Sequence, residues 1–423
     1  MRGITFTAAV TGLLTLAHSA FAAGPDTSIR PAERSSTITL AATTVQHESA
    51  QGLQGWIADF RPRAIAKGIT RATFDSAMRG LSYDAGIIER DRNQAEFTKT
   101  IWDYLDTAVS DLRIENGRKA LDKWDAALNK IEAEYGVEKE VIVAIWGLES
   151  AYGTFRGSVP IINALATLSY DARRADFFEG QLIEALRILQ NGDTTRARMQ
   201  GSWAGAMGHT QFMPTSFQAH AVDFDGDGRR NIWEDDPLDA LASTGAYLKH
   251  FGWTAGQPWG VEVRLPEGFD YTLANRENLK RPSDWAAKGV APVSGTFEDA
   301  HGLASILLPG GAQGAAFMIF SNFAVLEKYN TADAYVIGVG HLSDRIIGGK
   351  AIAHEWPRRL RALTKDERTE LQKRLTAAGF DTVKIDAKMG PLTINAVRRF
   401  QLSMGLQPDG YPSLAVLERL RAL

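Results

Sequence analysis

The sequence has 423 residues, of which 44% are hydrophobic and 23% are charged. This balance is typical of a globular protein and excludes a disordered or fibrous chain. The formal net charge of only −3 argues against a polyanionic partner, so nucleic-acid binding is disfavoured. Because cysteine is absent, disulfides, thiolate nucleophiles, thiolate metal sites and a lipid-modified cysteine are all excluded.

Residues 1–22 have the features of an export signal. Arg2 precedes an apolar stretch, residues 4–16, and Ala20-Phe21-Ala22 fits the small-x-small rule for cleavage. The alternative is an uncleaved membrane anchor, but the apolar run is shorter than the ~20 residues needed to span a bilayer. We therefore expect a periplasmic protein whose mature chain has no membrane span.

The rest of the chain divides by its hydrophobic pattern. Residues 23–50 are rich in Ser, Thr, Pro and Ala without a clear period, which indicates a flexible leader. A first domain is expected over 51–360, mainly helical, with short alternating apolar runs between about 259 and 320 that predict a small β-containing insertion. Helices should follow at about 322–329 and 331–342. A separate small unit is expected at 364–423.

Glu149 directly follows residues 141–148, which are apolar on every face and predict a helix buried on all sides. Gly153 is suited to end this helix, which would place Glu149 near the negative end of the helix dipole. The dipole and desolvation by Trp146 and Leu148 both raise the pKa of a carboxyl group. An acid that stays protonated near neutral pH can protonate a glycosidic oxygen. The alternative is a Glu that caps the helix or forms an ion pair.

A second block, residues 201–216, reads GSWAGAMGHTQFMPTS. Its glycines permit close backbone approach and tight bends, which suits the floor of a polysaccharide groove. Gln211, followed by Phe212-Met213-Pro214, favours the wall of a cleft. The alternative is a small-residue surface for helix packing, since Gly and Ala also permit close helix contacts.

Two motifs resemble one family. Residues 144–153, AIWGLESAYG, resemble the catalytic-glutamate motif of the lytic murein transglycosylase B family, and residues 201–216 resemble its AGAMG-x-x-QFMPSS signature. The resemblance covers about residues 53–360 and implies a lysozyme-like α+β catalytic domain. It implies a lyase that cleaves the β-1,4 bond between N-acetylmuramic acid and N-acetylglucosamine of peptidoglycan without water, leaving 1,6-anhydro ends. His209, where a tyrosine is expected, and Trp203 depart from the family pattern and bear on fine substrate preference.

The resemblance also implies residue roles. Glu149 would act first as the acid and then as the base, while the muramic N-acetyl carbonyl stabilises the anomeric centre and the O6 hydroxyl attacks it. Asn330 would hydrogen-bond the N-acetyl group, and no cofactor would be needed for catalysis. The residues implied to contact glycan or peptide are Ser202, Gln211, Tyr247, Tyr329, Asn330, Tyr335, Arg173 and Arg174.

Residues 223–229, DFDGDGR, have alternating carboxylates and a glycine at the sixth position, the spacing of an EF-hand calcium loop. Three carboxylates this close would repel one another without a cation. The alternative is a cluster of Asx turns without metal. Glu234 stands at the twelfth position, whereas the family pattern points to Asp239, so we expect structural Ca²⁺ held by Asp223, Asp225, Asp227, Arg229 (through its carbonyl) and Asp239.

The C-terminal unit has the pattern of three short helices, near the lower size limit of independent folding. Its Phe400-Gln401 and Gly405-Leu406 pairs resemble the peptidoglycan-binding domain type 1. That resemblance implies that the unit holds the enzyme on the wall and raises the local substrate concentration. The alternative is a helical dimerisation or docking unit.

Two other functions stay open from the sequence. One is a hydrolytic muramidase that uses Glu149 and a water nucleophile, and the other is a catalytically inactive wall-binding scaffold. The expected partners are peptidoglycan glycan strands and other cell-wall enzymes.

Overall fold

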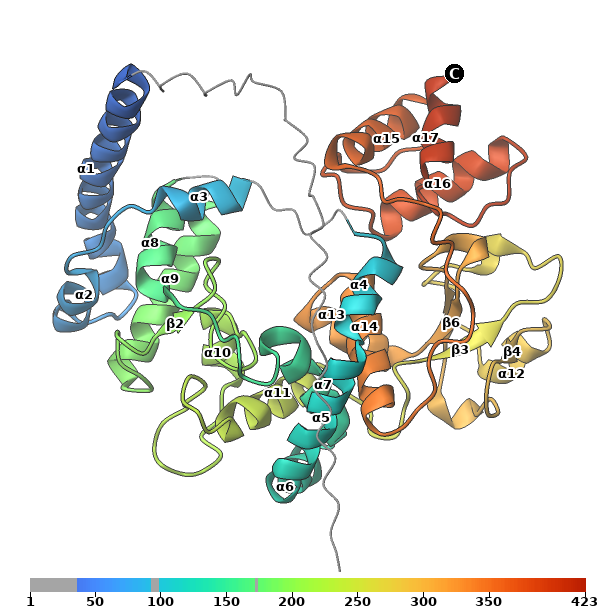
Figure 1. Ribbon diagram of the computed structural model, residues 1–423, viewed down its shortest axis with the longest axis horizontal. Helices are drawn as coiled ribbons and strands as arrows, with labels where there is room; N and C mark the ends of the chain where they lie inside the picture. Colours follow the sequence, from blue (N-terminus) through green and yellow to red (C-terminus); the bar gives the residue numbers. More distant parts are fainter. Residues whose placement is uncertain (1–35, 93–98, 172–173) are drawn as a thin grey trace, which may run out of the picture. The chain divides into compact units, whose positions relative to one another are not determined.

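The computed structural model describes residues 36–92, 99–171 and 174–423, which form mostly helices with two small antiparallel sheets (Figure 1). The first helix, α1 (Ser36–Ala66), begins inside the stretch 23–50 that was expected to be a leader without regular structure. Both prolines of that stretch precede the helix, and neither glycine nor proline occurs from residue 36 to residue 51, so nothing local interrupts it. The expected export signal, residues 1–22, lies outside the described residues.

Short helices follow α1 in close succession. Threonines start two of them: the side-chain oxygens of Thr70 and Thr100 accept hydrogen bonds from backbone N–H groups three residues later. No described helix combines the length and the apolar character needed to cross a bilayer. These helices are α2 (Arg71–Met78), α3 (Ala85–Arg92), α4 (Ile101–Ala108), α5 (Asp111–Lys123), α6 (Asp125–Tyr135), α7 (Lys139–Ser150), α8 (Ile161–Tyr170), α9 (Ala175–Asn191), α10 (Pro214–His220) and α11 (Leu238–His250).

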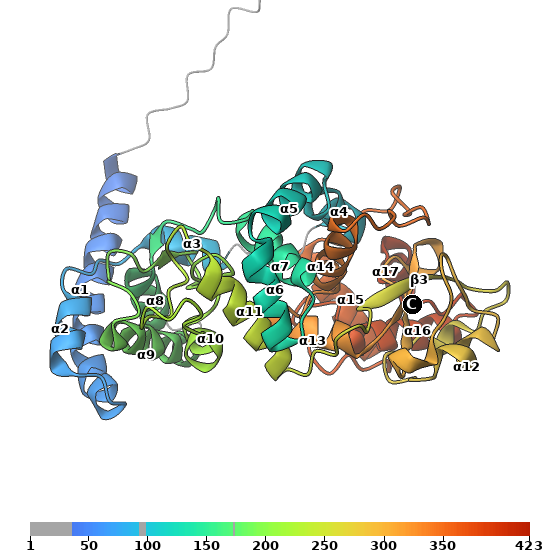
Figure 2. The same cartoon turned by 90° about the horizontal axis from the view of Figure 1, so that it is seen from below.

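Helix α7 lies at the centre of the main hydrophobic core. Every residue from Val141 to Gly147 is buried, as the all-apolar run predicted. The helix packs against α5, α6 and α11, and against α14 (Asp333–Ile346), and Figures 1 and 2 both show α5 and α14 beside it. This crowding fixes the carboxyl-terminal end of α7, where Glu149 lies.

The predicted β-containing insertion is confirmed. Four antiparallel strands pair in the order β4-β3-β6-β5, and Gly260 lies opposite Ile319 in the β3–β6 register. The insertion has its own core around Trp285, which is fully buried and donates its indole N–H to the Ala304 carbonyl at 2.9 Å. Its elements are β3 (Gly260–Arg264), η1 (Tyr271–Leu273), α12 (Pro282–Ala286), β4 (Ala291–Pro292), η2 (Asp299–His301), β5 (Ser305–Leu307), η3 (Gly311–Gln313) and β6 (Ala316–Ile319).

After the sheet, α13 (Ser321–Tyr329) and α14 return the chain to the main core, close to the two helices predicted there. The C-terminal unit forms three helices, as predicted: α15 (Lys365–Ala377), α16 (Pro391–Ser403) and α17 (Leu414–Arg421). Thr364 and Glu367 form a capping box that starts α15. Phe400 is fully buried in the small separate core of this unit.

Candidate active site

Helix α7 ends one residue after Glu149 in an unusual turn. Ala151 (φ 48°) and Tyr152 (φ 58°) are both left-handed, and Gly153 (φ 83°) follows them. The Ala151 N–H donates to the Gly147 carbonyl and the Tyr152 N–H to the Trp146 carbonyl, so the turn satisfies the last carbonyls of the helix. The prediction that Gly153 ends the helix is therefore wrong: Ala151 takes the left-handed cap position, which glycine usually occupies.

Tertiary hydrogen bonds hold this turn. The Tyr152 hydroxyl donates to the Arg113 carbonyl at 2.7 Å, and the Ser150 hydroxyl donates to the His209 carbonyl. The Arg113 guanidinium donates to the Gly147 carbonyl. Tyr152 belongs to the motif at 144–153, but its partner Arg113 could not be predicted because it lies 39 positions away along the chain.

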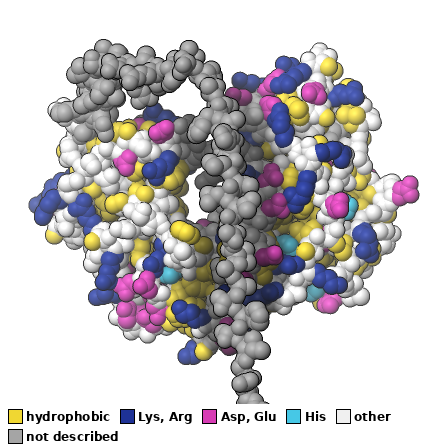
Figure 3. Space-filling view, viewed as in Figure 1, with side chains coloured by type: hydrophobic (Ala, Val, Ile, Leu, Met, Phe, Trp, Pro, Cys, Tyr) yellow, Lys and Arg dark blue, Asp and Glu magenta, His cyan; other side chains and the backbone are white. Residues whose placement is uncertain are grey.

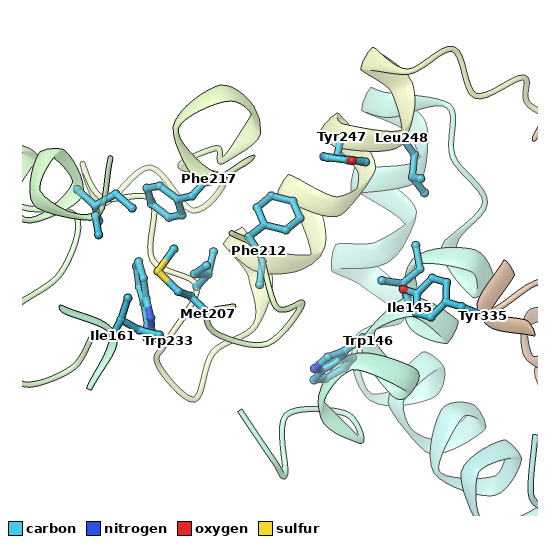
Figure 4. Packing of buried hydrophobic residues seen from close by; sticks show 14 of the residues in the cluster. Ile145, Trp146, Ile161, Met207, Phe212, Phe217, Trp233, Tyr247, Leu248 and Tyr335 are labelled. Atoms are coloured by element: carbon cyan, nitrogen blue, oxygen red, sulfur yellow. The ribbon is translucent and has the colours of Figure 1, made fainter. Parts of the chain in front are cut away.

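The Glu149 carboxyl is the central acid of the site. The side chain is partly buried, and its Oε1 accepts a hydrogen bond from the Tyr335 hydroxyl at 2.6 Å. Burial raises the pKa of Glu149 to about 7, although the Tyr335 hydrogen bond acts in the opposite direction. Figure 4 shows Tyr335 of α14 reaching the side of α7 at Ile145. A carboxyl with this pKa exchanges protons near neutral pH.

Three tyrosines surround this carboxyl. Tyr329 and Tyr335, which the family resemblance placed among the site residues, lie on α13 and α14 with their rings stacked 6.5 Å apart. Tyr104 of α4 was not predicted: burial, together with the nearby Glu149 charge, raises its pKa to about 12. The domain was predicted to be mainly helical, but no local signal shows which residue of α4 faces Glu149.

The block 201–216 forms a sequence of tight turns that ends at the start of α10, and two of its glycines, Gly201 and Gly205, lie close to α8 side chains. Its first residues pair as β2 (Gln200–Gly201) with β1 (Val159–Pro160). A Cβ added at Gly157 would lie 2.2 Å from the Gly201 backbone, so this pairing requires glycine. The Ser202 hydroxyl accepts a hydrogen bond from the Ala206 N–H at 3.0 Å and closes the following turn.

Hydrogen bonds from two neighbouring helices join this block to the acid. The Ser150 hydroxyl of α7 donates to the His209 carbonyl, and the Tyr329 hydroxyl of α13 donates to the carbonyl of the next residue, Thr210. Gln211 has φ 52°, and its side-chain amide donates to the carbonyls of Arg156 (3.0 Å) and Gly208 (2.8 Å). The structure thus brings Glu149, Tyr329, Tyr335 and the Gln211 turn together.

His209 is buried beneath the site as a neutral imidazole. Burial lowers its pKa to about 4. The Trp146 indole N–H donates to Nδ1 at 3.1 Å, which leaves the proton on Nε2 to be donated to the Glu234 carbonyl at 2.6 Å. His209 therefore connects α7 to the chain segment after the Asp-rich loop, and its ring is a structural contact.

Other residues expected at the site have structural partners. Tyr247 is 7% exposed, its hydroxyl donates to the Lys328 carbonyl at 2.6 Å, and its ring packs against Phe212 and Tyr329, so it supports the site from behind (Figure 4). Arg174 forms an ion pair with Asp91 at 2.9 Å at the start of α9. Arg173 lies outside the described residues.

Asn330 ends α13 and is exposed. Its side-chain oxygen accepts a hydrogen bond from the Ala332 N–H at 3.0 Å. Within the described residues its side-chain N–H groups donate to no protein atom, so they are free to meet a ligand. Asn330 directly follows Tyr329 in the chain.

In the Asp-rich loop, the carboxylate oxygens of Asp223, Asp225 and Asp227 lie within 4.8 Å of one another. Figure 3 shows acidic side chains gathered where Figure 1 places the loop before α11. Asp239 of α11 is buried, and its two oxygens accept hydrogen bonds from the N–H groups of Phe224 and Asn231, both at 2.7 Å. The Glu234 carboxylate instead pairs with Arg198, outside the convergent trio.

Comparison with protein families now identifies this architecture. Residues 52–344 match the family described as the transglycosylase SLT domain, which is more than half of the chain. The chain belongs to this family. Residues 364–420 match a peptidoglycan binding domain family, so this SLT-family protein has a second module whose bounds lie close to the predicted 364–423.

Individual relatives agree with this assignment. The membrane-bound lytic murein transglycosylase B of Escherichia coli is 35% identical over 242 residues, which cover 55% of this chain and 63% of that protein, less than two thirds of it. A crystal structure of SltB3 from Pseudomonas aeruginosa in complex with NAG-anhNAM-pentapeptide is 46% identical, covers 87% of this chain and 99% of that one, and has a TM-score of 0.84.

A second structure, E. coli SLT35 in complex with calcium, is 29% identical, covers 70% of this chain and 93% of that one, and has a TM-score of 0.59. These likenesses confirm the predicted lysozyme-like, mainly α architecture of the SLT-family domain.

Proposed function

We propose that the protein is a peptidoglycan lytic transglycosylase that cleaves the β-1,4 bond between N-acetylmuramic acid and N-acetylglucosamine. The observation that carries this proposal is the Glu149 carboxyl, which burial keeps protonated up to about pH 7 and which Tyr335 orients through a 2.6 Å hydrogen bond. An acid of this pKa is what protonation of a glycosidic oxygen requires near neutral pH. Family membership and the similarity to a complex with a NAG-anhNAM-pentapeptide support the same reaction.

A single carboxylate limits the mechanism. Glycosidases with two catalytic carboxylates place them within about 10 Å of one another. Among the described residues, the groups that interact with the Glu149 carboxyl are tyrosines: Tyr335 donates to it, and Tyr104 and Tyr329 lie near its charge. We therefore propose that the nucleophile comes from the substrate.

The proton balance follows from this. Glu149 gives its proton to the bridging oxygen as the bond to the muramic anomeric carbon breaks, while the N-acetyl carbonyl of that sugar stabilises the developing positive charge. The carboxylate then takes the proton of the muramic O6 hydroxyl as that oxygen attacks the anomeric carbon, which closes the 1,6-anhydro ring and returns Glu149 to its protonated form. We infer that Ser202, Gln211, Tyr329 and Asn330 position the sugars for both steps.

Mass spectrometry of digested peptidoglycan tests this function. We expect muropeptides that end in 1,6-anhydro-N-acetylmuramic acid, each lighter by one water than the hydrolytic product. Reducing ends that incorporate ¹⁸O from labelled water would instead establish a hydrolytic muramidase. Unchanged peptidoglycan, from an enzyme shown to be folded by its melting curve, would establish a wall-binding scaffold.

We propose that residues 364–423 bind peptidoglycan and keep the catalytic domain, residues 51–360, near its substrate. The match to a peptidoglycan binding family supports this division. We further propose that residues 1–22 direct export to the periplasm, where the substrate lies and where other cell-wall enzymes are available as partners.

We propose that the Asp-rich loop binds Ca²⁺ as a structural ion, held by Asp223, Asp225 and Asp227 and completed by Asp239 and the Arg229 carbonyl. The convergence of three exposed carboxylates supports a hard, oxygen-ligated cation, and Asp239 braces the backbone of the loop. The similar E. coli structure with calcium supports the choice of ion. The ion would stabilise the loop without taking part in bond cleavage.

Removal of calcium is therefore expected to lower thermal stability. At about 100 times its dissociation constant a ligand stabilises the folded state by about 2.7 kcal/mol, so chelation by EGTA should lower the Tm by about 5 °C. Asp225→Asn should remove most of this response, whereas Asp122→Asn, at an exposed position in α5, should keep it. Differential scanning fluorimetry with added Ca²⁺ or Mg²⁺ measures the effect, and a Tm indifferent to Ca²⁺ in the unmodified protein would refute the site.

A further inference from the structure

Arg276 of the β-containing insertion contacts both helices that carry the site tyrosines. One guanidinium nitrogen donates to Glu327 in the last turn of α13, and the other donates to Asp333, the first residue of α14. The guanidinium also lies over the ring of Phe323, 5.1 Å from its centroid. Only 22% of the Arg276 side chain is exposed, so water screens these contacts weakly.

The two carboxylates bracket the corner between the helices. Tyr329 follows Glu327 by two residues, and Tyr335 follows Asp333 by two residues. Without the guanidinium, Glu327 and Asp333 would be two like charges at a partly buried corner and would repel each other. Arg276 therefore fixes the angle at which α14 leaves α13.

The angle between α13 and α14 determines where the Tyr335 hydroxyl lies relative to Glu149. The Tyr329 and Tyr335 rings stack 6.5 Å apart, and the Tyr335 hydroxyl reaches Glu149 at 2.6 Å. A hydrogen bond this short tolerates little displacement of α14. The same corner also receives hydrogen bonds from the Tyr329 hydroxyl to the Thr210 carbonyl and from the Tyr247 hydroxyl to the Lys328 carbonyl, but Arg276 is the residue that contacts a carboxylate on each of the two helices.

We propose that Arg276 is a positioning residue of the active site: it clamps the α13–α14 corner so that Tyr335 is directed at Glu149. The β-containing insertion then has a role in the reaction, because it supplies the side chain that fixes the geometry of the acid. This inference rests on the proposed function of Glu149.

The test compares Arg276→Met with Tyr335→Phe and with the double variant. Because a misplacement of about 1 Å can cost on the order of 100-fold in rate, we expect Arg276→Met to lower kcat by about 10-fold or more and to change KM by less than about 2-fold. If Arg276 acts through Tyr335, the double variant should be no slower than Tyr335→Phe alone. Arg276→Lys, which keeps the charge, should recover part of the rate.

The pH profile provides a readout that a merely structural role would not move. The groups that face Glu149 are Tyr104 from α4, Tyr329 from α13 and Tyr335 from α14. The Tyr335 hydrogen bond lowers the pKa of Glu149, so its loss raises that pKa and keeps the acid protonated to higher pH. The alkaline limb of kcat/KM should therefore move to higher pH in Arg276→Met, as in Tyr335→Phe.

Arg63→Met is a matched control. Arg63 also donates twice to one carboxylate, Glu179 (2.9 and 2.7 Å), and lies over a phenylalanine, Phe60 (5.5 Å), but on α1. It should leave kcat and the pH profile unchanged. If Arg276→Met does not fold, Asp333→Asn, which weakens only the contact to α14, is measured in the same way.

Two outcomes would overturn the inference. One is a folded Arg276→Met enzyme whose kcat/KM profile has an unshifted alkaline limb. The other is a double variant whose loss in kcat equals the product of the two single losses. A failure of the proposed function looks different, because Glu149→Gln would then retain its rate in the otherwise unmodified enzyme.

Discussion

Glu149→Gln is expected to abolish cleavage of peptidoglycan. Glutamine has the same shape and can keep the Tyr335 contact, but it has no proton to give or take at the glycosidic and O6 oxygens. General acid–base catalysis contributes about 10²- to 10⁴-fold per step, and Glu149 would serve two steps. We therefore expect a loss of at least about 10³-fold in the release of soluble muropeptides from purified sacculi, with an unchanged melting temperature.

Glu140→Gln is the matched control for this experiment. Glu140 lies at the start of the same helix, is also partly buried, and has a pKa that burial raises. Because it lies more than two turns from Glu149, its replacement should leave the rate within about 2-fold of the unmodified enzyme. A Glu149→Gln enzyme that kept more than a tenth of the rate would rule out our mechanism.

Phe400→Ala is expected to unfold the C-terminal module while the catalytic domain stays folded. Phe400 is fully buried between the three helices and packs edge-on against Phe380, 5.7 Å away. Truncation of a buried phenylalanine costs about 3–5 kcal/mol, and a core of this size supplies about the same total. Retention on sacculi in a sedimentation assay should fall sharply, whereas cleavage of short soluble glycan fragments should continue.

Leu402→Ala on the same helix serves as its control, because Leu402 is 58% exposed and its loss should not affect folding. A Phe400→Ala protein whose module has lost its helical signal but which still sediments with sacculi would show that the module is not what holds the protein on the wall. If Phe400→Ala lowered the cleavage of soluble fragments as much as the cleavage of sacculi, the catalytic domain would depend on the C-terminal module for its activity.

Much of the site could be predicted because its strongest signals are local. The unbroken apolar run 141–148 determined both the helix and the burial of the carboxyl that follows it, and the raised pKa of Glu149 depends on that burial. The alternating runs after residue 259 likewise predicted the sheet, since strand periodicity is a property of neighbours in the chain. The family resemblance predicted Tyr329 and Tyr335 as residues that contact the glycan, which stays a prediction; the structure places the Tyr335 hydroxyl on Glu149.

The residues that escaped prediction all act across long sequence distances. Tyr104 and Arg276 reach the site from α4 and from the insertion, about 45 and 127 positions from Glu149 along the chain. The spacing of hydrophobic residues predicts a helix, but it does not show which residue elsewhere in the chain a given polar side chain of that helix will contact. Tyr247, expected from the family resemblance to contact substrate, is held by its hydroxyl and its packed ring, and its contact with substrate stays a prediction.

The left-handed turn after Glu149 has a consequence for how this protein could evolve or be engineered. Alanine and tyrosine in that conformation each cost roughly 1 kcal/mol or more relative to glycine, and contacts from Arg113 and His209 hold them there. Selection for thermal resistance alone would favour glycine at residue 151. A glycine at residue 151 would also make the turn that follows Glu149 more flexible. Selection for thermal stability and selection for catalytic rate should therefore favour different residues at this position.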